Sequence, residues 1–560
     1  MVQVQNTLEA RSGRKILVNT FKEIGLLLIS VFLFALSFPS AISDWGFFPF
    51  GFVAILPLFP VIHRSGWLKT CLYGIFYGWV AYGVFNYWLT TFHPLAVVIV
   101  PAIYAFYFLL VFPLLKLADK LFPNKGYLVQ LFIWMGYEYL RTRGFLGYPY
   151  GILGYSQYTF IPFIQIAEIT GVWGVTALVV FPSIYLGNGL RTGISGLKPW
   201  LQQNRLPGIV YCGLFVLNLV FGVITMNLDY GVPDKDGNSD TPQWKVALIQ
   251  HNADTWKGGF RAYQSNVDTL VRLSSEAIEE ATDLDAVVWS ETSVVPGIDW
   301  HTRYRTDQDR YQLVKGLTDY LSEQSVPFIF GNDDGQAIVD GNGHPILDDQ
   351  GSLQRVDYNA VIHFDYGEIQ GTYRKIHMVP FTEYFPYKDI FPHFYSLMVA
   401  KDFHFWEHGT EYTVFDVRGV KISTPICFED VFGDMSREFV RRGADVIVNL
   451  TNDSWSGAVS AEMQHAAMAV FRAVENRRSL VRGANSGLTC TILPTGQITA
   501  YAEPFTETYM IGSVPVYNDR TTLYTFWGEI FGMIFLYGAI VLLLAGIIIN
   551  IILLARKKKI

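Results

Sequence analysis

The sequence predicts a polytopic α-helical membrane domain joined to one large α/β domain outside the membrane. Apolar residues make up 51% of the 560 residues, and the mean hydropathy is +0.25. These apolar residues gather in long runs, as in a membrane protein rather than a soluble enzyme. The segment 229–525, between the last two runs, instead alternates strand-like and helix-like patterns. Such alternation indicates a layered α/β or α+β domain.

Eight apolar runs approach the length of about 20 residues that a helix needs to cross a bilayer. The first run follows Arg11, Arg14 and Lys15, as a signal peptide would, but a second apolar run begins within a few residues, so we expect a retained span. The predicted spans are Ile24–Phe38, Phe47–Ile62, Leu72–Leu89, Leu95–Leu115, Tyr127–Leu140, Phe163–Leu186, Gly208–Met226 and Phe526–Leu554.

The charges of the loops predict the orientation of these spans. Basic residues lie at both termini and in every second loop, and only Arg141 and Arg143 break this pattern. By the positive-inside rule both termini are then cytoplasmic. The predicted organisation is a membrane domain at 1–228, a domain at 229–525 on the opposite side, which in a bacterium is the periplasm, and a last span with a basic tail at 526–560.

The extramembrane segment begins with a predicted linker, Val232–Thr241, and contains a predicted exposed loop, Gly331–Gly351, rich in Gly, Asp and Asn. Helices are expected at 262–281, 311–323, 431–441 and 461–475. Strands are expected at 244–250, 286–289, 327–331, 360–364, 412–417, 420–423, 446–449, 479–483 and 489–493.

Several function classes find no support in the sequence. The net charge of −7 argues against a nucleic-acid partner. The histidines lack paired metal-ligand spacing, and no Gly-rich phosphate loop is evident, so we expect no metal and no cofactor. Cys71 and Cys212 lie in apolar runs, so no disulfide framework is indicated, although a Cys427–Cys490 bridge stays open.

Three residues of the extramembrane segment are candidates for chemistry. Cys427 lies between a strand-like and a helix-like stretch, where the positive end of a helix favours the thiolate. Glu291 ends a predicted strand, as a general base can, and Lys375 could stabilise an oxyanion. Taken singly, Glu291 could be a cap, Lys375 a solvated strand-end lysine and Cys427 an inert buried thiol. Together, a carboxylate, an ammonium and a thiol suit acyl transfer.

The order Glu–Lys–Cys resembles the triad of the nitrilase, or carbon–nitrogen hydrolase, superfamily. The resemblance extends through four later stretches, 448–455, 464–465, 472–477 and 482–487. Such a domain between the seventh and eighth of eight spans resembles the apolipoprotein N-acyltransferase family of the bacterial inner membrane. In the membrane half, Glu138–Arg141 and Gly154–Gln157 share this resemblance.

The resemblance implies a fold and a set of roles. The fold is an α/β nitrilase-like domain, an α-β-β-α four-layer sandwich. By position Glu291 is the general base, Lys375 the oxyanion-stabilising cation and Cys427 the nucleophile. The supporting residues are Glu383, Glu429 and Phe428, which stands where a tyrosine is also found. Ser456 departs from the aromatic usual at its position, and the candidates for substrate contact are Trp256, Tyr384 and Trp455.

The implied reaction moves an acyl chain from a phospholipid, through a thioester on Cys427, to the N-terminal amine of a diacylglyceryl-cysteine lipoprotein, with ping-pong kinetics. We expect a monomer in the bacterial inner membrane. Glu138 and Glu168 lie within or beside spans, where acids are costly and suggest function. They pair with Arg141 or Arg143 or contact a lipid headgroup, and the sequence leaves this choice open.

Two alternatives remain at this stage. The first is a membrane-tethered nitrilase or amidase that hydrolyses a C–N bond with the same triad. The second is a non-catalytic lipid transporter or scaffold. An intact triad argues against the second, and the resemblance inside the membrane half argues against the first.

Overall fold

The computed structural model describes residues 2–92, 95–232, 239–348, 351–399 and 404–557. The chain forms two compact units. The first holds Met1–Thr142, Tyr150–Thr225 and Glu529–Ile560, and the second holds Arg143–Pro149 and Met226–Gly528. Most of the predicted linker Val232–Thr241 lies outside the described residues, as do the last two lysines of the basic tail.

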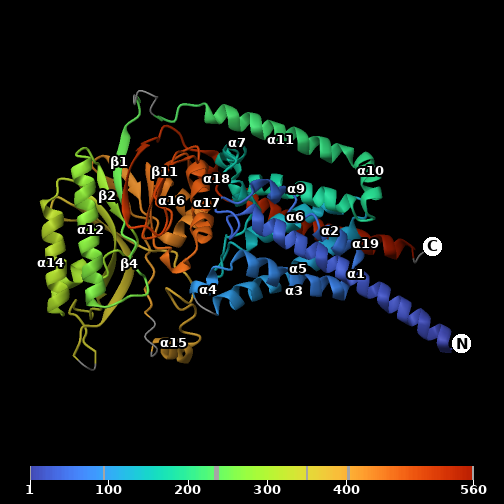
Figure 1. The fold of residues 1–560 in the computed structure, drawn as a ribbon, viewed down its shortest axis with the longest axis horizontal. Coiled ribbons are helices and arrows are strands. Elements are labelled where there is room, and N and C mark those ends of the chain that lie inside the picture. The colour runs from blue at the N-terminus through green and yellow to red at the C-terminus, as the bar shows by residue number, and fades with distance from the viewer. Residues whose placement is uncertain (1, 93–94, 233–238, 349–350, 400–403, 558–560) are drawn as a thin grey trace. The chain divides into compact units, whose positions relative to one another are not determined.

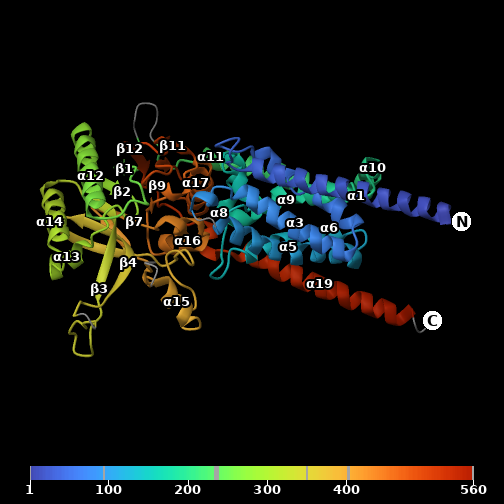
Figure 2. The same cartoon turned by 60° about the horizontal axis from the view of Figure 1, so that its bottom comes forward.

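The first unit is helical. Its long helices α1, α3, α5, α6, α9 and α19 lie side by side (Figures 1 and 2). Its elements are α1 (Val2–Ser37), η1 (Phe48–Phe52), α2 (Leu58–Arg64), α3 (Trp67–Phe85), α4 (Leu89–Phe92), α5 (Ala96–Leu121), α6 (Gly126–Leu140), η2 (Leu153–Gln157), α7 (Ile161–Ile164), α8 (Ala167–Thr170), α9 (Val172–Gly189), α10 (Ile194–Gln203), α11 (Arg205–Met226) and α19 (Ile530–Lys557).

Over the described ranges, 5 helices are long and apolar enough to cross a membrane. They are Leu17–Ser37 of α1, α5, α9, α11 and α19. The predicted span Phe47–Ile62 is wrong as a single helix, because Pro49 lies in the first turn of the short η1 and Pro57 precedes a separate α2. The predicted span Phe163–Leu186 is also divided, because Gly171 has φ +61° between α8 and α9.

The acidic residue within α6 forms a buried ion pair. Oε2 of Glu138 accepts a hydrogen bond from Nε of Arg141 at 2.7 Å, and their side chains are 2% and 1% exposed. Trp134 donates to the other carboxylate oxygen at 3.1 Å. Of the two open readings for Glu138, the structure therefore favours the ion pair over a headgroup contact. Arg143 belongs to the second unit, where it donates to Asp434 at 2.7 Å.

The second unit is built on two mixed six-stranded sheets, with orders β12-β1-β2-β3-β4-β5 and β11-β10-β9-β8-β7-β6. The pairs β1–β2, β2–β3, β7–β8 and β8–β9 are parallel and the other neighbours are antiparallel. The strands are β1 (Gln243–Gln250), β2 (Ala286–Trp289), β3 (Phe328–Ala337), β4 (Arg355–Asp365), β5 (Glu368–Arg374), β6 (Val414–Val417), β7 (Val420–Ser423), β8 (Val446–Thr451), β9 (Ser479–Ala484), β10 (Cys490–Ile492), β11 (Ile498–Tyr501) and β12 (Thr508–Pro515).

Helices cover the sheets of this unit. Its helical elements are α12 (Phe260–Glu280), α13 (Ile298–Tyr304), α14 (Gln308–Glu323), α15 (Pro392–Val399), η3 (Cys427–Val431), α16 (Gly433–Arg441), η4 (Ser454–Ser456), α17 (Val459–Asn476) and α18 (Leu523–Trp527). Helices α12 and α14 lie against the first sheet (Figure 1). Leu270 and Leu317 of these helices belong to one buried cluster with Trp289 and Phe328 of the sheet. The other face of this sheet meets the second sheet, where Val288 lies opposite Gly483.

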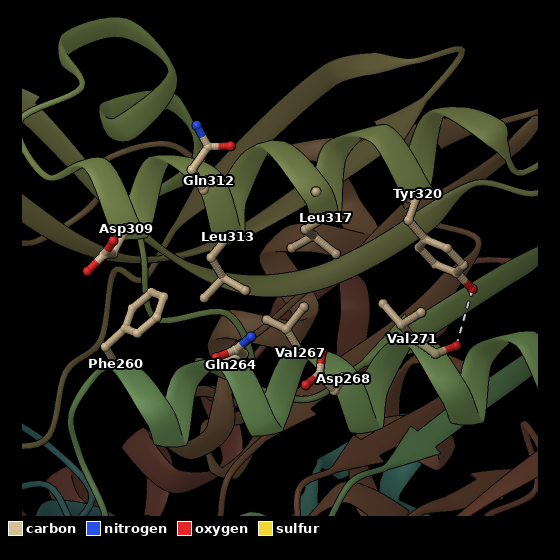
Figure 3. A pocket seen from close by; sticks show the side chains of 11 residues that line it. Phe260, Gln264, Val267, Asp268, Val271, Asp309, Gln312, Leu313, Leu317 and Tyr320 are labelled. Atoms are coloured by element: carbon tan, nitrogen blue, oxygen red, sulfur yellow. Dashed lines mark hydrogen bonds between the residues drawn. The ribbon is translucent and has the colours of Figure 1, made fainter.

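A groove of about 410 Å³ runs between α12 and α14. Figure 3 shows Val267 and Val271 facing Leu313 and Tyr320 across it, and the Tyr320 hydroxyl donates to the carbonyl of Val271 at 3.4 Å. None of the residues predicted to carry chemistry lines this groove. It is a feature of the outer helical layer.

The helices and strands expected from the sequence all form in this unit, with shifted ends. The expected loop Gly331–Gly351 is wrong in its first part, because β3 continues to Ala337 and pairs with β4 along its whole length. Eight of the described elements of this unit were not expected: α13, α15, α18, η3, η4, β5, β11 and β12. The edge strand β5 is polar and lacks a clear apolar period, so only its pairing with β4 reveals it.

Candidate active site

Cys427 occupies a strained turn between β7 and α16. Its φ is +48°, in the left-handed region that residues other than glycine rarely adopt. The side-chain amide of Asn449 braces this turn, donating to the carbonyl oxygens of Pro425 at 3.1 Å and of Cys427 at 3.3 Å. Strain of this kind persists where the surroundings hold it, and it collects at functional sites.

The environment of Cys427 favours the protonated thiol over the thiolate. Burial raises the pKa of the thiol well above its usual value, and the charge of Glu291 raises it further, against an opposing effect of Lys375. These effects oppose the stabilisation of a thiolate by a helix end that the sequence predicted; Cys427 begins the short η3, and α16 begins only at Gly433. A base must remove the proton before the sulfur can attack.

Lys375 follows directly after β5 and is completely buried. Its Nζ donates to Oε1 of Glu291 at 3.0 Å and to Oε1 of Glu383 at 2.6 Å. Burial alone would lower the pKa of Lys375, but the two carboxylates and Cys427 outweigh it and raise the pKa well above its usual value. These surroundings favour the charged ammonium, and one of its three protons is not used by these two bonds.

Glu291 follows β2, and both of its carboxylate oxygens are held. Oε1 also accepts from Nδ2 of Asn359 at 2.8 Å, and Oε2 accepts from the backbone N–H of Asn452 at 3.0 Å. The sequence did not reveal Asn359, which lies within β4, and assigned no role to Asn452. Together these donors set the orientation of the carboxylate.

Glu383 is the second carboxylate that bonds to the Lys375 ammonium. Its Oε2 accepts from the backbone N–H of Val379 at 2.7 Å, which closes a turn after Lys375. Burial raises the pKa of Glu383, and Glu291 adds to this, while Lys375 opposes it. Glu383, which the sequence predicted as a supporting residue, thus holds Lys375 in place.

Glu429 connects the lysine segment to the cysteine turn. Its Oε1 accepts from the backbone N–H groups of Ile376 at 2.7 Å and His377 at 2.9 Å, and its Oε2 accepts from that of Ile426 at 2.7 Å. The Tyr373 hydroxyl completes the set at 2.8 Å. Burial raises the pKa of Glu429 to about 7, although these donors oppose the rise. Glu429 therefore fixes the spacing of the two segments that carry Lys375 and Cys427.

The remaining predicted residues lie around this centre. The Phe428 ring packs edge-on against Phe432 with centroids 5.1 Å apart. Tyr384, next to Glu383, places its ring 4.6 Å from that of His408. Trp455 is half-buried in η4, whereas Trp256 is 63% exposed on the loop after β1.

A second buried cluster supports the cysteine turn from behind. Arg482 donates to Asp430 at 2.6 Å, to Asp453 at 2.7 Å and to Asn449 at 3.0 Å. The ring of His465 bridges the same two aspartates at 2.7 and 3.0 Å. Burial and Arg482 lower the pKa of His465, but the aspartates outweigh them and raise it to about 9.

Ser456 has a local role despite its departure from the expected pattern. Its hydroxyl donates to Glu462 at 2.5 Å and accepts from the N–H of Ala458, which precedes α17, at 3.2 Å. The departure is therefore accommodated at the start of α17.

Comparison with known proteins identifies the family. The profile described as "Apolipoprotein N-acyltransferase N-terminal domain" matches residues 30–185, and that described as "Carbon-nitrogen hydrolase" matches residues 245–520. "Apolipoprotein N-acyltransferase 1" of Treponema denticola is 38% identical, over 94% of this chain and 96% of its own. This chain belongs to the apolipoprotein N-acyltransferase family.

Other members of the apolipoprotein N-acyltransferase family match over similar lengths. "Apolipoprotein N-acyltransferase 1" of Treponema pallidum is 39% identical, covering 94% of this chain and 95% of its own. "Apolipoprotein N-acyltransferase" of Geobacter metallireducens is 31% identical, covering 92% and 94%. Because the matches span the helical unit and the carbon–nitrogen hydrolase region, they place the chain as a multi-pass membrane enzyme with a nitrilase-like domain.

The residues that the structure describes include no group of three His, Cys, Asp or Glu side chains that could hold a metal ion. All four cysteines are free thiols, so the open Cys427–Cys490 bridge does not form.

Proposed function

We propose that this protein is a phospholipid:apolipoprotein N-acyltransferase in which Glu291 is the general base, Lys375 the oxyanion-stabilising cation and Cys427 the nucleophile. The proposal rests mainly on the buried ammonium of Lys375, which lies 3.0 Å from Glu291 and 2.6 Å from Glu383. Cys427 is close enough to contribute to the raised pKa of Lys375. Acyl transfer needs a nucleophile, a base and a cation that stabilises the oxyanion. The Cys427 thiol, the oriented Glu291 carboxylate and the Lys375 ammonium can supply them, and the ammonium has one proton that its two carboxylate bonds do not use.

In the first step Glu291 takes the proton of Cys427, and the sulfur attacks the carbonyl carbon of a phospholipid acyl ester. The oxygen of that carbonyl becomes an oxyanion beside the Lys375 ammonium. The C–O bond of the ester then breaks, and the lysophospholipid leaves as an alcohol with the proton that Glu291 returns. The acyl chain remains on Cys427 as a thioester.

In the second step the N-terminal amine of a diacylglyceryl-cysteine lipoprotein attacks the thioester. Glu291 accepts a proton from the amine, the C–S bond breaks, and the sulfur takes a proton back. The products are an amide and the free thiol. Because the first product leaves before the acceptor reacts, one site serves two lipid substrates in turn, and the kinetics are ping-pong.

The number of membrane spans, their orientation and the oligomeric state are part of the same proposal. We propose eight crossings of the bacterial inner membrane, two of them through the divided segments Phe47–Ile62 and Phe163–Leu186. We also propose cytoplasmic termini, a periplasmic catalytic domain at 229–525 with four α-β-β-α layers, and a monomeric protein. The basic residues at both termini and in alternate loops support this orientation. Trp256, Tyr384 and Trp455 are proposed to contact substrate, and Phe428 to border the nucleophile.

The amidase alternative has less support. A membrane-tethered amidase would need the carbon–nitrogen hydrolase region alone, yet residues 30–185 also match the N-terminal domain of the acyltransferase family. The non-catalytic scaffold is likewise disfavoured, because the three predicted catalytic side chains share one buried cluster of charges.

Mass spectrometry tests the proposal most directly. Protein incubated with phospholipid and no acceptor should gain one acyl mass on the peptide that carries Cys427, and one lysophospholipid should be released per protein. The mass should disappear when a lipoprotein peptide with a free amine is added. Acylation retained in Cys427→Ala would remove this cysteine from the proposed role.

A further inference from the structure

Asn485 lies where strands from both sheets end. It follows β9 and is 1% exposed. Its backbone N–H donates to the carbonyl of Thr451, the last residue of β8, at 3.0 Å. Its own carbonyl accepts from the N–H of Asn252, two residues beyond β1, at 2.9 Å. The residue therefore joins the loop after β8 to the loop after β1.

The side-chain amide of Asn485 bonds to both loops as well. Toward the first sheet, Oδ1 accepts from the N–H of Ala253 at 2.8 Å and Nδ2 donates to its carbonyl at 2.8 Å. Toward the loop after β8, Nδ2 donates to Oδ1 of Asn452 at 3.1 Å and to Oγ of Ser454 at 3.3 Å. A buried amide with both ends engaged in this way fixes the backbone around it.

These two loops carry groups that matter for the reaction. The loop after β8 supplies the N–H of Asn452 that holds Oε2 of Glu291 at 3.0 Å. The loop after β1 carries the exposed Trp256, and its Thr255 hydroxyl donates to Oδ1 of Asn452 at 3.2 Å and also contacts the hydroxyl of Ser454. The side-chain amide of Asn485 thus connects Asn452, whose peptide N–H bonds to Glu291, with the loop that carries Trp256.

We propose that Asn485 is a positioning residue for Glu291, and that through it the position of the Trp256 loop sets the orientation of the base. Without Asn485, the Asn452 peptide loses its fixed place and the Glu291 carboxylate can turn about its terminal bond, which has a broad rotational well. Proton transfer requires hydrogen-bond distance to the thiol, so a turned carboxylate is a poorer base. This inference rests on the proposed role of Glu291.

Asn485→Ala and Asn485→Asp test the inference, with Ser486→Ala as the matched control. The aspartate keeps the acceptor for Ala253 but loses both donors. Ser486 also ties the end of β9 to the loop after β1, donating to Oδ1 of Asn252 at 2.8 Å, without bonding to Asn452 or Glu291. All variants are purified as the full chain and compared for melting temperature.

Both Asn485 variants should acylate Cys427 about 10- to 100-fold more slowly, the range expected for a misplaced reacting group. The KM for phospholipid should change by less than about threefold, since ground-state binding is retained. Alkylation of Cys427 by iodoacetamide, followed on its peptide by mass spectrometry, should slow in parallel because it needs the same deprotonation. Ser486→Ala should stay within about twofold of wild type in all three.

Normal acylation of Cys427 in folded Asn485→Ala would overturn the inference. So would a loss of acylation that only matches the loss of folded protein, with the alkylation rate of the folded protein unchanged. Thr255→Val, which removes only the hydroxyl bonds to Asn452 and Ser454, should show a smaller loss of the same kind. If the Asn485 variants do not fold, Thr255→Val tests the inference in their place, and normal acylation and alkylation in it would overturn the inference. Glu291→Gln is measured in parallel, because normal acylation there would instead refute the role of Glu291 itself.

Discussion

The Nζ atom of Lys375 lies 3.0 Å from Oε1 of Glu291, and the two side chains are 0% and 7% exposed. The residues come from the ends of β2 and β5, which belong to one sheet and are separated in it by β3 and β4. At this depth each charge depends on the other, because an unpaired ion in a low-dielectric interior is costly. Changes to either side chain should therefore affect both chemistry and stability.

Glu291→Gln should abolish proton removal while keeping the shape of the site. The amide is isosteric but cannot accept the thiol proton, so the rate of acyl-enzyme formation should fall by about 10² to 10⁴-fold. The measurement is the time course of acyl mass on Cys427 after mixing with phospholipid. The control is Glu279→Gln, an exposed change on α12 that should behave like wild type. A rate loss below tenfold in Glu291→Gln would exclude Glu291 as the base.

Lys375→Met should lower stability as well as activity. It leaves Glu291 and Glu383 facing each other without their cation, and breaking a buried pair in this way costs about 3–5 kcal/mol. The free energy of unfolding in detergent, or the melting temperature, measures this cost. Activity should be undetectable, because no cation remains beside the oxyanion.

The double variant Lys375→Met/Glu383→Gln separates the two effects. It removes one of the two stranded charges, so roughly half of the lost stability should return. Acyl-enzyme formation should not return, because the cation is still absent. Recovery of activity together with stability would mean that Lys375 acts only as a structural partner.

Gly331→Ala should damage the site through the backbone that carries Glu291. A Cβ at this position of β3 would lie 2.3 Å from the N of Thr292 and 2.7 Å from the O of Ser290, so residues 290–292 would have to move. A shift of about 1 Å in a catalytic group can cost about 100-fold in rate. Gly316→Ala on α14 meets nothing within 4 Å and should instead stabilise the protein by about 0.5–1 kcal/mol with full activity; equal activity in the two variants would contradict the prediction.

Stability should depend on pH through Glu429. The folded protein keeps a proton on this carboxyl up to a pKa of about 7, whereas the reference value is 4.5. The folded state therefore binds more protons between these limits, and its stability falls as the pH rises through this window, by up to about 3 kcal/mol. Melting temperatures of wild type and Glu429→Gln between pH 4.5 and 7.5 should converge toward the upper end; parallel curves would contradict this.

Much of the second unit could be predicted because its strands are short apolar runs at turn-separated intervals. The run Ala286–Trp289 and the helix around Ala461–Glu475 are read correctly from composition alone. The edge strand β5 could not be predicted, because its sequence EIQGTYR is polar and is held as a strand by pairing with β4. The division of the second apolar run at Pro57 shows the converse case, in which hydropathy alone conceals a break.

The sequence by itself determined the family, and it predicted a two-part organisation with Glu291, Lys375 and Cys427 as the triad, because local motifs and long apolar runs carry that information. Tertiary structure alone decided how they interact. Burial raises the pKa of the Cys427 thiol, Asn449 holds its strained turn, Asn359 and Asn452 orient the Glu291 carboxylate, and Glu429 spaces the two segments. These effects depend on desolvation and on hydrogen bonds between residues distant in the chain, which no local pattern encodes.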